Sequence, residues 1–108
     1  MTSKPLVRRA QARREIDDAI DHYLREGGVA LALRFVDAID QANDLIQHPS
    51  AGSPRYAHLL DVPGLRTLRV KGFPYVFFYI EHRDRADVWR FLHGHRDVLA
   101  ELEIDLEE

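Results

Sequence analysis

The chain has 108 residues, a formal net charge of −3 and no cysteine. This length supports one domain with a real core and is too short for two, so we expect a single domain over residues 1–108. The lack of cysteine excludes disulfides, thiol chemistry and thiolate metal sites. No segment resembles a signal peptide, and the uncharged run 72–80 is far shorter than the ~18 apolar residues of a membrane span. We therefore expect a cytoplasmic protein.

The charges are distributed unevenly along the chain. Eight basic and four acidic residues lie between Arg55 and Arg96, whereas the segment from Asp97 to Glu108 holds six acidic residues and no basic one. The second half of the chain is therefore locally basic and ends in an acidic tail. Such a tail is either solvated or folded back over the basic surface.

The first half predicts a short strand followed by two amphipathic helices. Residues 5–8 fit the strand, and apolar residues recur at helical spacing over residues 12–24 and again over 32–46. Gly27-Gly28 separates the two helical patterns, and a proline follows the second. The two-glycine joint favours an antiparallel helix hairpin. The segment 50–64, rich in Pro, Gly and Ser, is expected to be a loop.

Three strand patterns follow, over residues 66–71, 75–80 and 86–93. Their short connections predict an antiparallel meander. Strict alternation places Val88 and Leu92 on one face of the last strand, with Trp89 and Phe91 on the other. Because the second and third strands are apolar on both faces and the helices can cover only one, we expect an exposed apolar patch on the opposite face. Such a patch marks an interaction site.

The chain ends in a short amphipathic pattern. Val98, Leu99, Leu102 and Leu106 are spaced as one helical stripe, and Asp97 stands at the N-cap position. Taken in order, the elements predict an α+β fold of two layers, a strand, a helix hairpin and a three-stranded antiparallel meander (βααβββ), followed by a short C-terminal helix.

Several motifs in this order resemble those of one toxin superfamily. They are Tyr23 in the first helix, His48-Pro49 followed by Gly52, the run FPYVFFY at residues 73–79 and the run FLHGHRD at residues 91–97. Together they resemble the RelE/ParE superfamily of bacterial type II toxin–antitoxin systems over nearly the whole chain. The resemblance implies a toxin that is neutralised, in a hetero-oligomer, by a small antitoxin encoded beside it.

The superfamily includes two activities, messenger RNA cleavage on the ribosome by RelE-like members and inhibition of DNA gyrase by ParE-like members. RNA cleavage through the 2′-hydroxyl needs a base, an acid and cations that stabilise the charged phosphorane. For a ribonuclease, the candidate catalytic residues are Arg69, Lys71, His93, His95 and Arg96. The chain has no tyrosine after Tyr79, its apolar-striped terminal segment is similar to that of ParE-like toxins, and an acidic tail would repel RNA. We therefore favour a gyrase-binding toxin without catalytic residues. The alternatives are a ribosome-dependent ribonuclease and an inactive relative retained as an antitoxin-binding module.

The candidate binding residues form two sets. Those expected to meet the target are Arg69, Lys71, Arg90, Arg96, Val98, Leu99 and Leu102. Those expected to meet a helix or an added strand of the antitoxin are Tyr75, Phe77, Tyr79, Phe35 and Ile39. The two histidines of the HGH motif share one side of a strand end but have no clear third ligand, so we expect neither a metal nor another cofactor.

Overall fold

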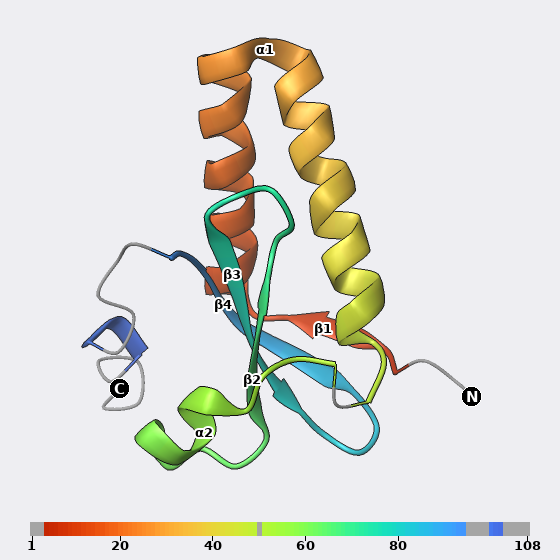
Figure 1. The fold of residues 1–108 in the computed structure, drawn as a ribbon, viewed down its shortest axis with the longest axis vertical. Coiled ribbons are helices and arrows are strands. Elements are labelled where there is room, and N and C mark those ends of the chain that lie inside the picture. Colours follow the sequence, from red (N-terminus) through yellow and green to blue (C-terminus); the bar gives the residue numbers. More distant parts are fainter. Residues whose placement is uncertain (1–3, 50, 95–99, 103–108) are drawn as a thin grey trace.

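The computed structural model describes residues 4–49, 51–94 and 100–102. Its helices and strands follow the order β1 (Leu6–Arg8), α1 (Ala10–Ile46), α2 (Arg55–Leu60), β2 (Leu65–Arg69), β3 (Tyr75–Glu81) and β4 (Ala86–His93). Residues 100–102 add a helical turn, called here the C-terminal turn. The strands form one sheet in the order β1-β4-β3-β2, in which β1 is parallel to β4 and the other pairs are antiparallel (Figure 1). The predicted α+β order of elements is confirmed.

The long helix α1 is a hairpin of two arms. Gly28 has φ 76° and ψ −173°, a conformation that glycine adopts without the penalty that a Cβ would impose. The chain therefore reverses at this residue, and the two arms lie side by side on one face of the sheet (Figure 1). The hairpin predicted from Gly27-Gly28 is confirmed. Within the described residues, no helix combines the length and the apolar character that a membrane span needs.

The main core lies between α1 and the sheet. Aromatic rings dominate it: Phe35 lies 4.6 Å from Tyr23, and Tyr75 stacks on Phe91 at 5.0 Å, both distances measured between ring centroids. Four residues predicted to contact the antitoxin are buried in this core, namely Phe35, Ile39, Phe77 and Tyr79. Their assignment to a surface is therefore corrected, because the periodicity of helix and strand placed them on apolar faces without showing that these two faces pack against each other. Tyr75 remains partly exposed.

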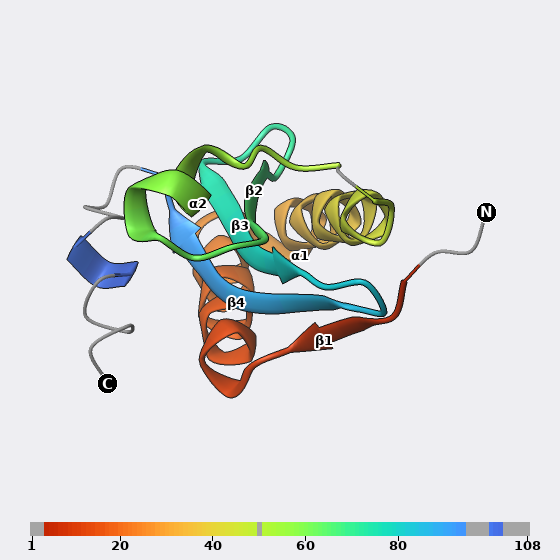
Figure 2. The ribbon, with the colours of Figure 1, turned by 90° about the horizontal axis from the view of Figure 1, so that it is seen from below.

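The opposite face of the sheet is covered as well. Residues 55–60 form α2 where the sequence predicted a loop, and Figure 2 shows α2 on the other side of the sheet from α1. Together with Leu102, α2 encloses a second apolar cluster that includes Phe78 and Leu92, each only 1% exposed. The predicted exposed patch is therefore wrong. Leu102 is itself fully buried, so its predicted role in target contact is corrected to one in packing.

A β-bulge sets which side chains of β4 face each layer. Tyr79 pairs with Val88 and Phe78 with Arg90, which leaves Trp89 as the extra residue. Val88 and Phe91 consequently face α1, whereas Trp89 and Leu92 lie in the second cluster. Strict alternation, which placed Val88 with Leu92, fails at this point.

Gly52, the glycine that follows His48-Pro49, lies where the chain packs closely against β2. Its carbonyl accepts a hydrogen bond from Nη1 of Arg66 at 2.5 Å, and the next residue, Ser53, pairs with Thr67 of β2. A Cβ at Gly52 would lie 2.5 Å from the Tyr79 hydroxyl and 2.7 Å from the Thr67 carbonyl oxygen. Burial raises the pKa of the Tyr79 phenol above its ordinary value.

Gly52→Ala is therefore expected to lower the free energy of unfolding by about 1–3 kcal/mol, the usual cost of overpacking a filled site. The loss should be smaller in a Tyr79→Phe background, because one of the two obstructing atoms is then absent. Urea denaturation of the unchanged chain, Gly52→Ala, Tyr79→Phe and the double variant measures both effects. Equal losses in the two backgrounds would contradict the role assigned to the hydroxyl.

Candidate functional site

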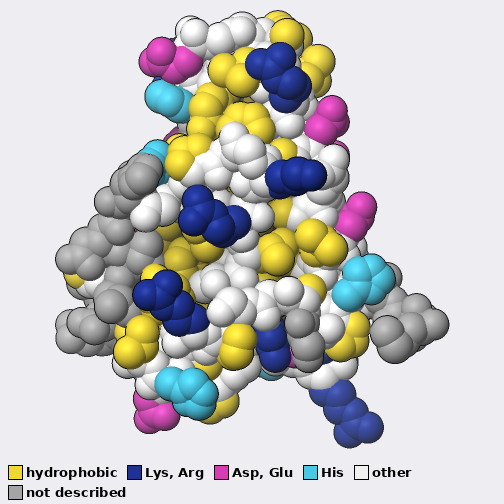
Figure 3. Space-filling view, viewed as in Figure 1, with side chains coloured by type: hydrophobic (Ala, Val, Ile, Leu, Met, Phe, Trp, Pro, Cys, Tyr) yellow, Lys and Arg dark blue, Asp and Glu magenta, His cyan; other side chains and the backbone are white. Residues whose placement is uncertain are grey.

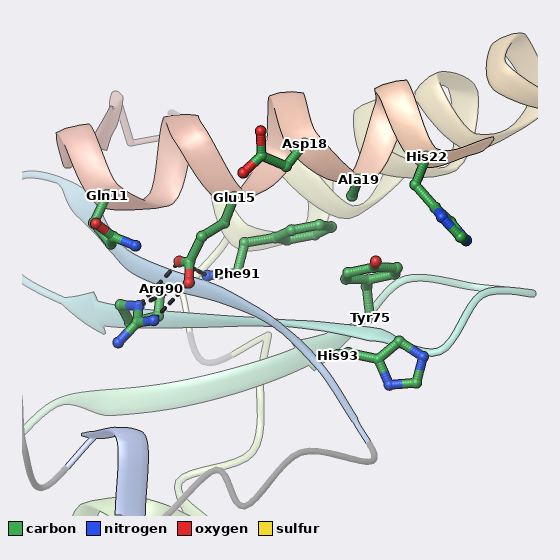
Figure 4. A pocket seen from close by; sticks show the side chains of 9 residues that line it. All are labelled: Gln11, Glu15, Asp18, Ala19, His22, Tyr75, Arg90, Phe91 and His93. Carbon is green, nitrogen blue, oxygen red and sulfur yellow. Dashed lines mark hydrogen bonds and ion pairs between the residues drawn. The ribbon is translucent and has the colours of Figure 1, made fainter. Parts of the chain in front are cut away.

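A carboxylate of α1 accepts a hydrogen bond from the part of the β4 edge that does not pair with β1. β1 pairs with β4 only along Ala86–Val88, so Phe91 lies beyond the last of these β1 pairs. Glu15 Oε1 accepts hydrogen bonds from the backbone N–H of Phe91 and from Nε of Arg90, both at 3.0 Å, and Oε2 accepts one from Arg90 Nη2 at 2.6 Å. Figure 4 shows Glu15 reaching down from α1 to both groups. The backbone donor is thereby satisfied by a side chain instead of a strand.

Arg90 links this carboxylate to the C-terminal turn. Its Nη2 lies 3.2 Å from Oε2 of Glu101, and Arg90 is only 7% exposed. The predicted role of Arg90 as a target contact is therefore corrected. Its guanidinium is held inside the chain by Glu15 and Glu101, a pairing between distant segments that strand periodicity cannot reveal.

A pocket of about 310 Å³ opens beside this ion pair. Its lining residues are Gln11, Glu15, Asp18, Ala19, His22, Tyr75, Arg90, Phe91 and His93. His22, Tyr75 and His93 lie at the end away from Arg90 (Figure 4), and the ring of His93 packs edge-on against Tyr75 at 5.2 Å. Because Arg90 is already paired with carboxylates and Asp18 adds a further negative charge, the described residues of the pocket offer no surplus positive charge to a phosphate.

A second groove, of about 370 Å³, lies on the α2 side of the sheet. Its lining residues are Ser53, Arg55, Tyr56, Thr67, Arg69, Val76, Phe78 and Gly94. Together these described residues combine an apolar floor with two exposed arginines, and none of them is His, Asp or Glu. The groove therefore suits binding of an anionic, partly apolar partner better than proton transfer.

Four basic side chains that line two surface depressions are exposed and form no ion pair with any other described residue. They are Arg34, Arg55, Arg69 and Lys71, called here the basic face. Arg34 and Lys71 line one shallow depression together with Asp37, and Arg55 and Arg69 line the groove. Figure 3 shows Lys and Arg side chains spread over the middle of this view and acidic side chains at its margins.

The described members of the predicted nuclease set are not brought together. His93 lines the pocket beside α1, Arg69 lines the groove on the opposite side of the sheet, and Lys71 lies in the third depression. The sheet thus separates the histidine from Arg69. The other predicted residues, His95, Arg96, Val98 and Leu99, and the predicted N-cap Asp97, lie outside the described residues.

Comparison with known proteins identifies the family. Residues 6–98 match the family described as "ParE toxin of type II toxin-antitoxin system, parDE". The chain belongs to this ParE toxin family. A solved structure described as "Chromosomal ParDE TA system from P. aeruginosa" has a similar fold, with a TM-score of 0.68 and 23% sequence identity over 84% of this chain and 96% of that chain. A comparison with curated protein sequences found no match.

These findings confirm the predicted superfamily and its ParE-like branch. Sequence reasoning nevertheless missed Glu15 and the basic residues Arg34 and Arg55. Glu15 did leave a signal, because it lies three residues after Ala12 and four before Ala19, on the stripe of α1 that the structure buries. A carboxylate in that position indicates a buried cation or backbone donor elsewhere in the fold.

The Glu15–Arg90 pair yields a stability prediction. Glu15→Ala is expected to lower the free energy of unfolding by about 3 kcal/mol, because the Arg90 charge stays buried with one of its carboxylates removed. The double variant Glu15→Ala/Arg90→Met should be less destabilised than the sum of the two single variants. Chemical denaturation measures this coupling.

Arg9→Met is the matched control, since Arg9 pairs with Asp87 at 2.9 Å but its side chain is 48% exposed. An exposed pair of this kind contributes less than about 1 kcal/mol. If Glu15→Ala and Arg9→Met lowered the free energy of unfolding by the same small amount, Glu15 would not have the structural role assigned to it.

Proposed function

We propose that this ParE-family chain inhibits growth by binding DNA gyrase in the cytoplasm, through surface contacts and without chemistry of its own. The observation that carries the proposal is the separation of His93 from Arg69 and Lys71, which divides the described part of the nuclease set among three sites. A ribonuclease needs its proton carrier and its cations around one phosphate. A binding toxin has no such requirement, so the arrangement favours the gyrase alternative.

Induction of the chain alone, without an antitoxin, is expected to raise the DNA-damage response and to leave messenger RNA intact. In vitro, the purified chain should inhibit supercoiling by gyrase. Transcripts cut on the ribosome, with no effect on gyrase, would instead establish the ribonuclease alternative. A folded chain that does neither would support the inactive, antitoxin-binding relative.

His93→Ala and His95→Ala are expected to leave growth inhibition within about threefold of the unchanged chain, because no proton transfer is involved, whereas a nuclease that loses its acid or base typically slows by ~10²–10⁴-fold. Growth on induction and gyrase inhibition by the purified variants provide the measurement. Thermal denaturation must first show that both variants remain folded. Near-complete loss of inhibition by a folded variant would overturn the proposal.

We further propose that a cognate antitoxin neutralises the toxin by covering the basic face with an acidic segment. Burial of Phe35, Ile39, Phe77 and Tyr79 removes most of the surface first predicted for the antitoxin, whereas the basic face is exposed and its charges are unpaired among the described residues. An acidic partner would satisfy these charges and speed its own encounter with the toxin. Two of these cations, Arg69 and Lys71, are also candidate target contacts, so neutralisation would follow from direct competition.

The edge of β2 gives such a segment a place to pair. Thr67 already exchanges backbone hydrogen bonds of 2.9 Å with Ser53 on the outer side of β2. Arg69, two residues further along the strand, directs its backbone N–H and carbonyl to the same side. An extended acidic segment that continues from the position of Ser53 would pair with Arg69 and lie beside the cations of the groove.

Arg69→Glu/Lys71→Glu is expected to weaken antitoxin binding at least about tenfold, mainly through a slower association rate, and to flatten its dependence on salt. Surface plasmon resonance at several salt concentrations with the product of the neighbouring gene measures this. Arg13→Glu/Arg83→Glu, a reversal of two exposed cations outside the basic face, is the control. Equal affinities for the two double variants would argue against the basic face as the antitoxin site.

A further inference from the structure

The C-terminal turn is attached to the sheet at two adjacent residues. Leu102 is fully buried in the cluster that contains Trp89 and Leu92. Glu101, the preceding residue, places Oε2 3.2 Å from Nη2 of Arg90. One contact is apolar and non-directional, whereas the other is ionic and depends on orientation. The ionic contact is therefore the one that can fix how the turn is rotated on the sheet.

The orientation of Arg90 is in turn fixed by α1. Its Nε and Nη2 bind the two carboxylate oxygens of Glu15 at 3.0 Å and 2.6 Å, the bidentate geometry that guanidinium and carboxylate groups favour. Nη2 has two hydrogens, so the hydrogen not used by Glu15 is available to Glu101. A lysine ammonium has no such planar fork and would not transmit the orientation of one carboxylate to the other.

The burial of the two carboxylates differs. The Glu15 side chain is 12% exposed, and that of Glu101 is 31% exposed. The Glu15–Arg90 contact belongs to the folded body of the protein, whereas the Glu101 contact lies nearer to solvent and can be removed without opening the core. The two contacts are therefore separable by mutation.

We infer that Arg90 is a positioning residue that seats the C-terminal turn on the sheet, with Glu15 fixing its orientation. This inference does not depend on gyrase binding; only its consequence for the target rests on the proposed function. If the C-terminal segment meets gyrase, the presentation of that segment depends on a carboxylate in the first arm of α1. In that case, Arg90 affects the binding of gyrase without contacting gyrase itself.

Glu101→Gln and Arg90→Lys test the inference on the full-length chain. Glu101→Gln removes the charge of the exposed partner with little change in volume, and Arg90→Lys keeps the charge but removes the fork. Asp87→Asn, on the same strand, removes an ion pair with Arg9 that does not involve the turn and serves as the control. Amide hydrogen exchange, followed by mass spectrometry, reports on peptides that contain residues 100–102 and on peptides from α1 and β3.

Exchange at residues 100–102 is expected to be about fivefold faster or more in Glu101→Gln and Arg90→Lys, because the hydrogen bond that holds the turn loses the charge of its acceptor in one variant and its planar donor in the other. Exchange in α1 and β3 should be unchanged in Glu101→Gln. The double variant should exchange no faster at these residues than the faster single variant, since both changes remove the same contact. Asp87→Asn should behave like the unchanged chain.

Unchanged exchange at residues 100–102 in Glu101→Gln would overturn the inference, whatever the effect on growth. If Arg90→Lys fails to fold, Glu101→Gln still decides the matter, because its side chain is partly exposed. Faster exchange together with weaker gyrase inhibition and unchanged antitoxin affinity would support both the positioning role and its consequence for the target. Faster exchange with full gyrase inhibition would support the positioning role and show that the turn is not a gyrase contact, which separates this test from that of the proposed function.

Discussion

The backbone N–H of Phe91, beyond the last β1 pair, is the constraint around which much of this structure is arranged. A buried donor of this kind must be satisfied, and Glu15 supplies an acceptor from the helix layer. A carboxylate that is largely removed from solvent then needs a cation, which Arg90 provides, and the other hydrogen of Arg90 Nη2 reaches Glu101. One unpaired strand position thus leads to a chain of contacts that joins α1, the sheet and the C-terminal turn.

Several cations outside the basic face also have acidic partners. Glu15 and Glu101 neutralise Arg90, Glu81 lies 3.6 Å from Lys4 and 3.3 Å from Arg66, and Asp87 binds Arg9 at 2.9 Å. The basic face, by contrast, has no acidic partner among the described residues. A chain with a net charge of −3 can therefore present a strongly basic surface.

The fold could be read from the sequence where the pattern is local. Residues 86–93 were predicted as a strand and form β4 with the same bounds, and glycine at position 28 correctly predicted the helix reversal. α2 was missed because it is six residues long and contains no fully buried side chain, so no period shows in the sequence. The bulge at Trp89 and the burial of Arg90 depend on partners in other segments, 75 residues away in the case of Glu15.

A second apolar layer lies on the sheet face opposite α1. α2 and the C-terminal turn occupy the sheet face opposite α1, and the groove left beside them has arginines at its rim and Val76 and Phe78 in its lining. Among the described residues, the lining of the groove holds no His, Asp or Glu, and His93 lies across the sheet beside Tyr75. On binding of a partner, a surface of this composition lowers the free energy of the complex by burying apolar area and by pairing its charges. Neither contribution requires a covalent bond to be broken. Specificity for a partner then rests on the placement of the cations, so a loop or helix that shifts the basic face would change the partner while leaving the fold intact.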